Sequence, residues 1–225
     1  MLTNSKSQYK YFGFAIFISV SIATFFSYSD NLFWYAIFKP ITTLLIIALS
    51  IIIYKKQKTR YTILIITALL FALIGDILLI GEDYFVFGLA AFLLAHILFT
   101  IAFLSVKKFF TKPIYLAILL SIGGAYYYFL YPHLEGYQIP VIIYLLTIVI
   151  MNWQALSLSR DQKQNNIQLL GVAALLFSFS DGVIAYDKFV EPLSYSSILI
   201  LPTYWLAITI FTFMGSRIKD PHTNS

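Results

Sequence analysis

The sequence contains no cysteine and few charged residues. Of its 225 residues, 11% are Asp, Glu, Lys or Arg, and three are histidine. The missing cysteine excludes disulfide bonds, thiolate nucleophiles and cysteine metal ligands. A soluble domain carries about 25% charged residues, whereas 60% of this chain is hydrophobic. We therefore expect the lipid bilayer to be the solvent for most of the chain, which leaves no room for a sizeable water-soluble domain.

Histidine is too scarce for a conventional zinc centre. Only His96 lies within an apolar run, whereas His133 stands beside Pro132 in a predicted loop and His222 in the C-terminal tail. A zinc hydrolase needs several histidine, cysteine or carboxylate ligands at one point in space. We therefore expect no metal site and no other cofactor.

Long apolar runs dominate the chain instead. A helix needs roughly 20 apolar residues to cross the hydrocarbon core, and these runs are too continuously apolar for the alternating strands of a barrel. The sequence predicts an all-α polytopic membrane helix bundle of about eight transmembrane helices, with residues 1–225 forming a single transmembrane domain. The expected spans are residues 11–27, 33–54, 61–80, 84–104, 113–131, 139–157, 167–186 and 194–214.

Basic residues are unevenly divided between the predicted loops. The first apolar run follows two lysines without a convincing cleavage site, so we interpret it as a span and not as a signal peptide. One side of the membrane then receives all basic residues except Lys39 and Lys188, and the positive-inside rule predicts that both termini are cytoplasmic. We expect an integral protein of a bacterial inner membrane whose basic loops contact anionic lipid and not nucleic acid. The 13 basic residues on that side are Lys6, Lys10, Lys55, Lys56, Lys58, Arg60, Lys107, Lys108, Lys112, Arg160, Lys163, Arg217 and Lys219.

Several polar residues interrupt the apolar runs. A charge near the bilayer centre costs several kcal/mol, so such residues indicate function. At 1.5 Å per residue, Lys39, Asp76 and Asp181 lie roughly 8–10 Å below the outer boundary, and His96 and Tyr204 lie deeper. Different helices thus place polar groups in the outer half of the membrane, which predicts a functional site there.

Structural roles remain open for some of these residues. Lys39 could reach the surface, with Pro40 marking a helix start, and His96 could be an interhelical hydrogen-bonding residue. The segments that end at Asp76 and Asp181 resemble each other, so a duplicated four-span unit is also open.

Two other classes of function can be weighed from the same residues. Proton-coupled carriers use buried Asp, His and Lys, so a proton-coupled transporter or channel is the main alternative to an enzyme. An intramembrane serine protease could be built on Ser180 and His96. No glycine motif of the oxyanion type accompanies Ser180, which disfavours that alternative.

The order and spacing of a series of short motifs are similar to those of a known protein family. Over about residues 39–210 the chain resembles the YhhN-like lysoplasmalogenase family of membrane proteins. One feature of the family is missing: a glutamine often follows the tyrosine of its last span, whereas this chain has Trp205 and then Ile208 there. The matching motifs are Lys39-Pro40, Gly75-Asp76 with Leu78-Leu79, Phe87-Gly88-Leu89 with Phe92 and Ala95-His96, Tyr144 with Met151, Ser180-Asp181 with Ala185 and Lys188-Phe189, and Thr203-Tyr204 with Ala207.

The resemblance implies a hydrolase that cleaves the vinyl ether bond of lysoplasmalogens, so that the partner is a lysophospholipid taken from the membrane. Vinyl ethers cleave by acid, which requires one protonated carboxyl group and one carboxylate that activates water, as in inverting glycosidases. We expect Asp76 and Asp181 to form this catalytic pair, with the acid and the base unassigned. A catalytically silent lipid-binding relative stays open because the glutamine is missing. The residues expected to bind substrate are Lys39, His96, Tyr204, Ser180 and Lys188.

Overall fold

The protein is described from a computed structural model. Its described residues are 2–106, 112–161 and 167–218. The side chain of Lys6 is not among the described ones. Five residues named above lie outside the described ranges: Lys107, Lys108, Lys163, Lys219 and His222.

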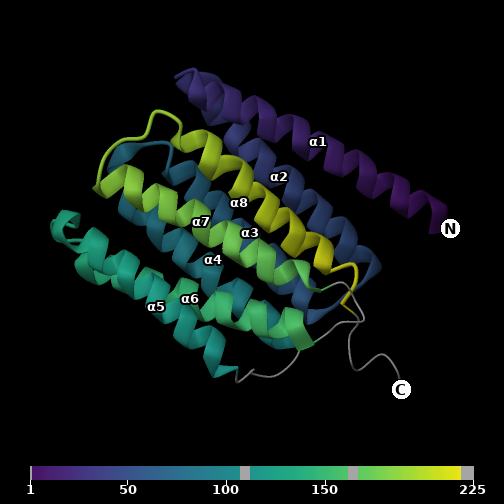
Figure 1. The fold of residues 1–225 in the computed structure, drawn as a ribbon. Helices are drawn as coiled ribbons and strands as arrows, with labels where there is room; N and C mark the ends of the chain where they lie inside the picture. The colour runs from purple at the N-terminus through teal and green to yellow at the C-terminus, as the bar shows by residue number, and fades with distance from the viewer. Residues whose placement is uncertain (1, 107–111, 162–166, 219–225) are drawn as a thin grey trace.

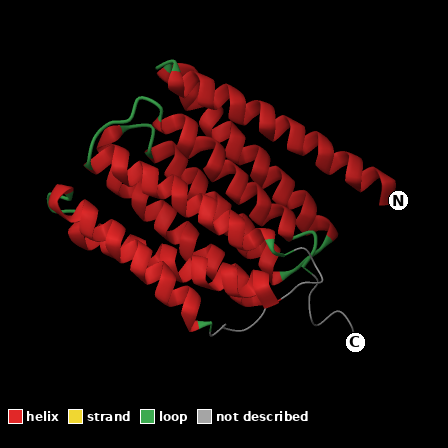
Figure 2. Cartoon of the chain, viewed as in Figure 1, coloured by secondary structure: helices red, strands yellow, loops and turns green. Residues whose placement is uncertain are grey.

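Within these ranges the chain folds into helices and contains no strand (Figure 2). Eight α-helices are each long and apolar enough to cross a membrane, which confirms the predicted all-α bundle. The helices are α1 (Leu2–Tyr28), α2 (Leu32–Lys56), α3 (Arg60–Leu78), α4 (Phe85–Val106), α5 (Pro113–Leu130), α6 (Gln138–Asp161), α7 (Leu169–Phe189) and α8 (Ser196–Met214), with short 3-10 turns η1 (Glu82–Tyr84) and η2 (Tyr131–His133).

Local capping residues set several helix ends. The Asn31 side chain accepts a hydrogen bond from the backbone N–H of Trp34 at the start of α2. At the start of α3, Thr59 and Thr62 form a reciprocal capping box. Such caps satisfy backbone N–H groups that have no partner within the helix. Because α2 begins at the Asn31 cap, it starts well before Pro40.

The alternative in which Pro40 marks a helix start is therefore wrong, since Pro40 lies inside α2. A proline within a helix removes one backbone donor, which membrane helices tolerate when neighbouring groups compensate. The alternative in which Lys39 reaches the surface also fails, because its side chain is only 5% exposed. Lys39 instead points into the bundle.

The helices pack in an arrangement that leaves two of them at the margins. In Figure 1, α1 runs along one edge beside α2 and α8, and α5 lies at the opposite edge beside α6. The centre is filled by completely buried aromatic side chains, among them Phe99, Phe177, Trp205 and Phe211. Because lipid tails are as apolar as these side chains, close van der Waals packing holds the helices together.

Contacts between distant segments fix one end of the bundle. Lys56 Nζ donates a hydrogen bond to Gln8 Oε1 at 3.1 Å, and the Gln57 side chain donates to the carbonyl oxygen of Ile218. The N-terminal part of α1, the connection from α2 to α3 and the residues after α8 thus share this end (Figure 1). The connections that follow α1, α3, α5 and α7 lie at the opposite end.

Candidate active site

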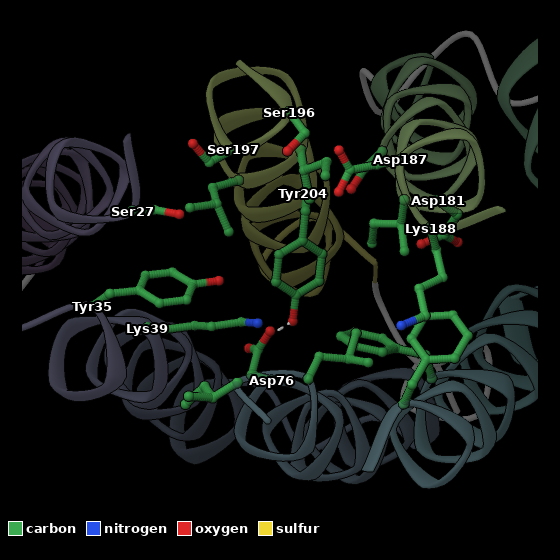
Figure 3. A pocket seen from close by; sticks show the side chains of 18 of the residues that line it. Ser27, Tyr35, Lys39, Asp76, Asp181, Asp187, Lys188, Ser196, Ser197 and Tyr204 are labelled. Atoms are coloured by element: carbon green, nitrogen blue, oxygen red, sulfur yellow. Dashed lines mark hydrogen bonds between the residues drawn. The ribbon is translucent and has the colours of Figure 1, made fainter. Parts of the chain in front are cut away.

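A cavity of about 450 Å³ lies near the end of α1 and the start of α8, and its lining includes Ser27, Gly81 and Ser196. Side chains from α1, α2, α3, α4, α7 and α8 line it, and Figure 3 shows the labelled polar groups around its centre. Six of the seven residues predicted from the sequence lie in its wall, whereas His96 does not. The six are Lys39, Asp76, Ser180, Asp181, Lys188 and Tyr204.

Asp76 is held by hydrogen bonds from two other helices, α2 and α8. Its side chain is 1% exposed, and its Oδ2 accepts hydrogen bonds from Thr43 Oγ1 at 2.5 Å and from the Tyr204 hydroxyl at 3.0 Å. Thr43 Oγ1 in turn accepts a hydrogen bond from Trp205 Nε1 at 3.0 Å. Lys39 of α2 is the positive charge beside this carboxyl group (Figure 3). Asp76 therefore acts as a hydrogen-bond acceptor in a fixed orientation.

Asp181 of α7 has a different set of partners. The Tyr144 hydroxyl donates a hydrogen bond to its Oδ2 at 3.2 Å, and His96 Nε2 lies 3.1 Å from the same oxygen. This histidine contact has the distance of an ion pair, but the ring is not aligned for a hydrogen bond. Asp181 thus stands between the cavity on one side and an imidazole on the other.

The tautomer of His96 follows from its second nitrogen. Its Nδ1 lies 2.7 Å from the carbonyl oxygen of Phe92, and a carbonyl oxygen only accepts hydrogen bonds. We therefore assign a proton to Nδ1. The remaining nitrogen, Nε2, faces Asp181 at 3.1 Å. His96 lies behind Asp181, where it contacts this aspartate.

Ser180 and Lys188 face the cavity in different ways. Ser180 is 1% exposed and its Oγ has no hydrogen-bond partner among the described residues. A buried hydroxyl without a partner is destabilising unless water or a ligand binds it. Lys188 is exposed near the cavity and lies over the Phe85 ring, with Nζ 5.2 Å from the ring centroid. The wall therefore offers a free hydroxyl inside and a cation at its rim.

A glycine lets one aromatic ring approach the site closely. A Cβ atom at Gly75 would lie 2.6 Å from the ring of Phe92, which is too close for any real side chain. That ring stands edge-on against Tyr204, with centroids 5.6 Å apart. Gly75 thus allows Phe92 to support Tyr204, the residue that donates to Asp76.

The sequence of this chain matches a known protein family. The model of the YhhN family matches residues 34–214. This chain belongs to the YhhN family. Together with its eight apolar helices, membership makes it an integral membrane protein and confirms the resemblance found in the sequence. No solved structure matches the chain.

Curated relatives of this YhhN-family protein cover most of its length. It is 32% identical over 196 residues to lysoplasmalogenase TMEM86B from Homo sapiens, which covers 87% of this chain and 81% of the relative. It is 34% identical over 171 residues to lysoplasmalogenase TMEM86A from Bos taurus, covering 70% of this chain and 67% of the relative. It is 29% identical over 145 residues to the uncharacterized membrane protein YhhN of Escherichia coli O157:H7, covering 63% and 67%.

Three members of the hydrogen-bond network were not predicted as site residues. Thr43 follows Lys39 by four residues, so both lie on one face of α2, and this spacing was the available signal. Tyr144 was noted only as part of a matching motif. Trp205 marked the departure from the family pattern, and it supplies an N–H donor to the network.

The part of the chain that the structure describes holds no group of three His, Cys, Asp or Glu residues able to bind a metal ion. The acidic and basic side chains that line the cavity are Lys39, Asp76, Asp181, Asp187 and Lys188, and His96 contacts Asp181 from behind. Their arrangement can donate a proton at one point of the wall and accept one at another.

Proposed function

We propose that this YhhN-family protein hydrolyses the vinyl ether bond of lysoplasmalogens and releases a fatty aldehyde and a glycerophospho-alcohol. The observation that carries the proposal is that Asp76 and Asp181, on different helices, line one shielded cavity. The names of the relatives in Homo sapiens and Bos taurus support the same substrate class. We also propose that the whole chain forms one membrane domain.

The first step needs an acid, because a vinyl ether reacts when a proton adds to its alkenyl carbon. We assign this role to Asp181 together with His96, whose Nε2 lies 3.1 Å from the carboxyl oxygen, with one proton shared by the two groups. Transfer of that proton to the carbon next to the ether-bearing carbon forms a C–H bond and leaves an oxocarbenium ion. The pair then consists of a carboxylate and a neutral imidazole, and the carboxylate stabilises the adjacent cation.

The second step needs a base, and we assign it to Asp76. A water molecule attacks the oxocarbenium carbon while Asp76 removes a proton from that water, which yields a hemiacetal. The hemiacetal collapses when protonated Asp76 returns its proton to the departing glycerol oxygen. The Asp181–His96 pair takes the hydroxyl proton at the same time, so both groups regain their starting states and the aldehyde is free.

The polar remainder of the cavity suits the glycerophospho head group. Lys39 and Lys188 supply positive charge for a phosphate, and Ser180 supplies a hydroxyl without a partner among the described residues. A lysolipid carries its ether linkage just below the membrane interface, near the depth expected for the two aspartates. We further propose a bacterial inner membrane with both termini cytoplasmic, so that the cavity opens toward the outer face.

The direct test uses purified protein in detergent with an alkenyl lysophospholipid, and aldehyde release is measured by mass spectrometry. We expect the wild type to release aldehyde, and Asp76→Asn and Asp181→Asn each to lower turnover by about 100-fold to 10,000-fold, the range for loss of a general acid or base. Asp83→Asn, on an exposed residue of η1, is the matched control and should retain activity.

Heavy water tests the order of the steps. If the aldehyde is reduced to the alcohol as it forms, it should carry one deuterium on the second carbon of the chain, because protonation there starts the reaction. A wild-type protein that releases no aldehyde contradicts the hydrolase. A proton-coupled carrier would act only across sealed vesicles, and an Asn variant with normal turnover would remove that aspartate from the pair.

A further inference from the structure

A second cavity lies between α5, α6 and α7, and it is almost entirely apolar. It encloses about 240 Å³. We call it the α5–α6–α7 groove. Exposed side chains of α5 such as Ile122 border it, so it faces the lipid on one side. Its apolar wall includes Leu119, Ile122, Gly123, Leu145, Ile148 and Leu175.

The groove meets the candidate active site at Asp181. This residue lines the polar cavity, the groove, and a small space of about 50 Å³ between them. Tyr144, which donates a hydrogen bond to Asp181, lines both the small space and the groove. The proposed acid therefore stands where a polar compartment changes into an apolar one.

A polar pair lines the groove at the level of Asn152. Asn152 Nδ2 donates hydrogen bonds to Ser178 Oγ at 2.5 Å and to the Ile148 carbonyl oxygen at 2.9 Å, and both Asn152 and Ser178 line the groove. From Val141 to Asn152 the groove follows α6 for about 16 Å, at 1.5 Å per residue. An apolar chain that runs along this path meets polar atoms at its end.

We infer that the α5–α6–α7 groove binds the alkenyl chain of the substrate and sets which chain lengths are cleaved. This inference rests on the proposed function. The bond to be cleaved joins a polar head group to one hydrocarbon chain. The junction of the two cavities matches this change, because the cavity on one side of Asp181 is polar and the groove on the other side is apolar. With the head group in the polar cavity and the reacting carbons beside Asp181, the chain continues into the apolar groove, where burial of its methylene groups is favourable.

Two adjacent glycines of α5 provide the test variant and its control. A Cβ atom at Gly123 would lie 3.1 Å from the Leu145 side chain and 3.4 Å from that of Val149, inside the groove, whereas Gly124 has nothing within 4 Å. Gly123→Leu therefore fills the middle of the groove, and Gly124→Leu adds the same group to the same helix outside it.

We expect Gly123→Leu to lower kcat/KM for a hexadecenyl lysolipid by about 10-fold or more, a typical effect of blocking an apolar pocket. Its kcat/KM for an octenyl lysolipid should stay within about 2-fold of wild type, and Gly124→Leu should change neither value. An unchanged chain-length profile in Gly123→Leu overturns the inference.

A second measurement on the wild-type protein depends on neither folding of a variant nor catalysis. An alkyl ether lysolipid, which lacks the reactive double bond, carries a photoreactive diazirine at the end of its chain. We expect cross-links on the groove residues of α5, α6 and α7, and cross-links confined to other helices overturn the inference. If these cross-links form but no aldehyde is released from alkenyl lysolipid, the chain site stands and the hydrolase fails. If aldehyde is released while cross-links lie elsewhere, the hydrolase stands and the chain site falls.

Discussion

At the scale of single residues, the two aspartates differ in what surrounds them. Asp76 accepts hydrogen bonds from neutral donors, in a chain that runs from Trp205 through Thr43 to the carboxyl oxygen. Asp181 faces a titratable imidazole, that of His96. In the proposed reaction, Asp76 with its fixed donors serves as the base, and Asp181, which contacts His96, serves as the acid.

The hydrogen-bond chain to Asp76 predicts a positioning role for Trp205. Trp205→Phe removes one donor, whose net worth is about 0.5–1.5 kcal/mol, so we expect kcat for aldehyde release to fall by about 2-fold to 10-fold. KM should stay near its wild-type value because Trp205 does not line the cavity. Kinetics of the purified variant check both values.

A double-variant cycle separates positioning from general destabilisation. If Trp205 acts through Thr43, the double variant Trp205→Phe, Thr43→Val should be no slower than Thr43→Val alone. Trp34→Phe is the control, since this residue lies at the exposed start of α2. Additive losses in the double variant would show that Trp205 does not act through Thr43.

The sequence predicted the charged part of the site better than the neutral part. Asp76 and Asp181 stood out because a buried charge is costly in a membrane helix. Thr43 and Tyr144 did not, since hydroxyl side chains occur in membrane helices for ordinary packing and interface reasons. Nor could the sequence show that His96 contacts Asp181, because that contact depends on how α4, α6 and α7 pack.

At the scale of helices, close packing of α3 on α4 positions part of the site. Gly75 allows the Phe92 ring to lie against α3, and Phe92 contacts Tyr204 and supplies the carbonyl oxygen that faces His96. The small residue before Asp76 thus serves helix packing. Hydropathy predicted the spans, including one over residues 33–54 that contains Pro40, and the Asn31 cap sets the start of that helix.

This packing predicts a strong effect of one methyl group. Gly75→Ala places a Cβ atom 2.6 Å from two carbons of the Phe92 ring, and overpacking of this kind costs about 1–3 kcal/mol. We expect a lower thermal midpoint in detergent and reduced aldehyde release, because Phe92 must shift against Tyr204. Gly13→Ala, where nothing lies within 4 Å, should behave like wild type. A Gly75→Ala protein with an unchanged midpoint would contradict this account of the packing.

At the scale of the whole molecule, an even number of spans places the start of α1 and the end of α8 at one end of the bundle. Described basic residues gather at that end, including Lys55 and Lys56 at the end of α2, Lys58 in the connection from α2 to α3, and Arg60 at the start of α3. The proposed orientation puts this end in the cytoplasm, since basic loops are retained there. The polar cavity then opens on the other face.

The absence of cysteine makes this orientation directly measurable. In intact cells, a membrane-impermeant maleimide should label Asp83→Cys, on the connection between α3 and α4. It should label Lys58→Cys only after the membrane is permeabilised. Both residues are exposed, and the wild type supplies an unlabelled control because it has no cysteine. The reversed labelling pattern would refute the proposed orientation.

The position of Asp181 between a polar cavity and an apolar groove has a consequence for the fate of the products. A fatty aldehyde left in the groove can pass laterally between α5 and its neighbouring helices into the hydrocarbon core of the bilayer. The glycerophospho-alcohol, which dissolves in water, can depart through the opposite compartment. Separation into two immiscible phases would keep the fragments from meeting again and make cleavage run in one direction.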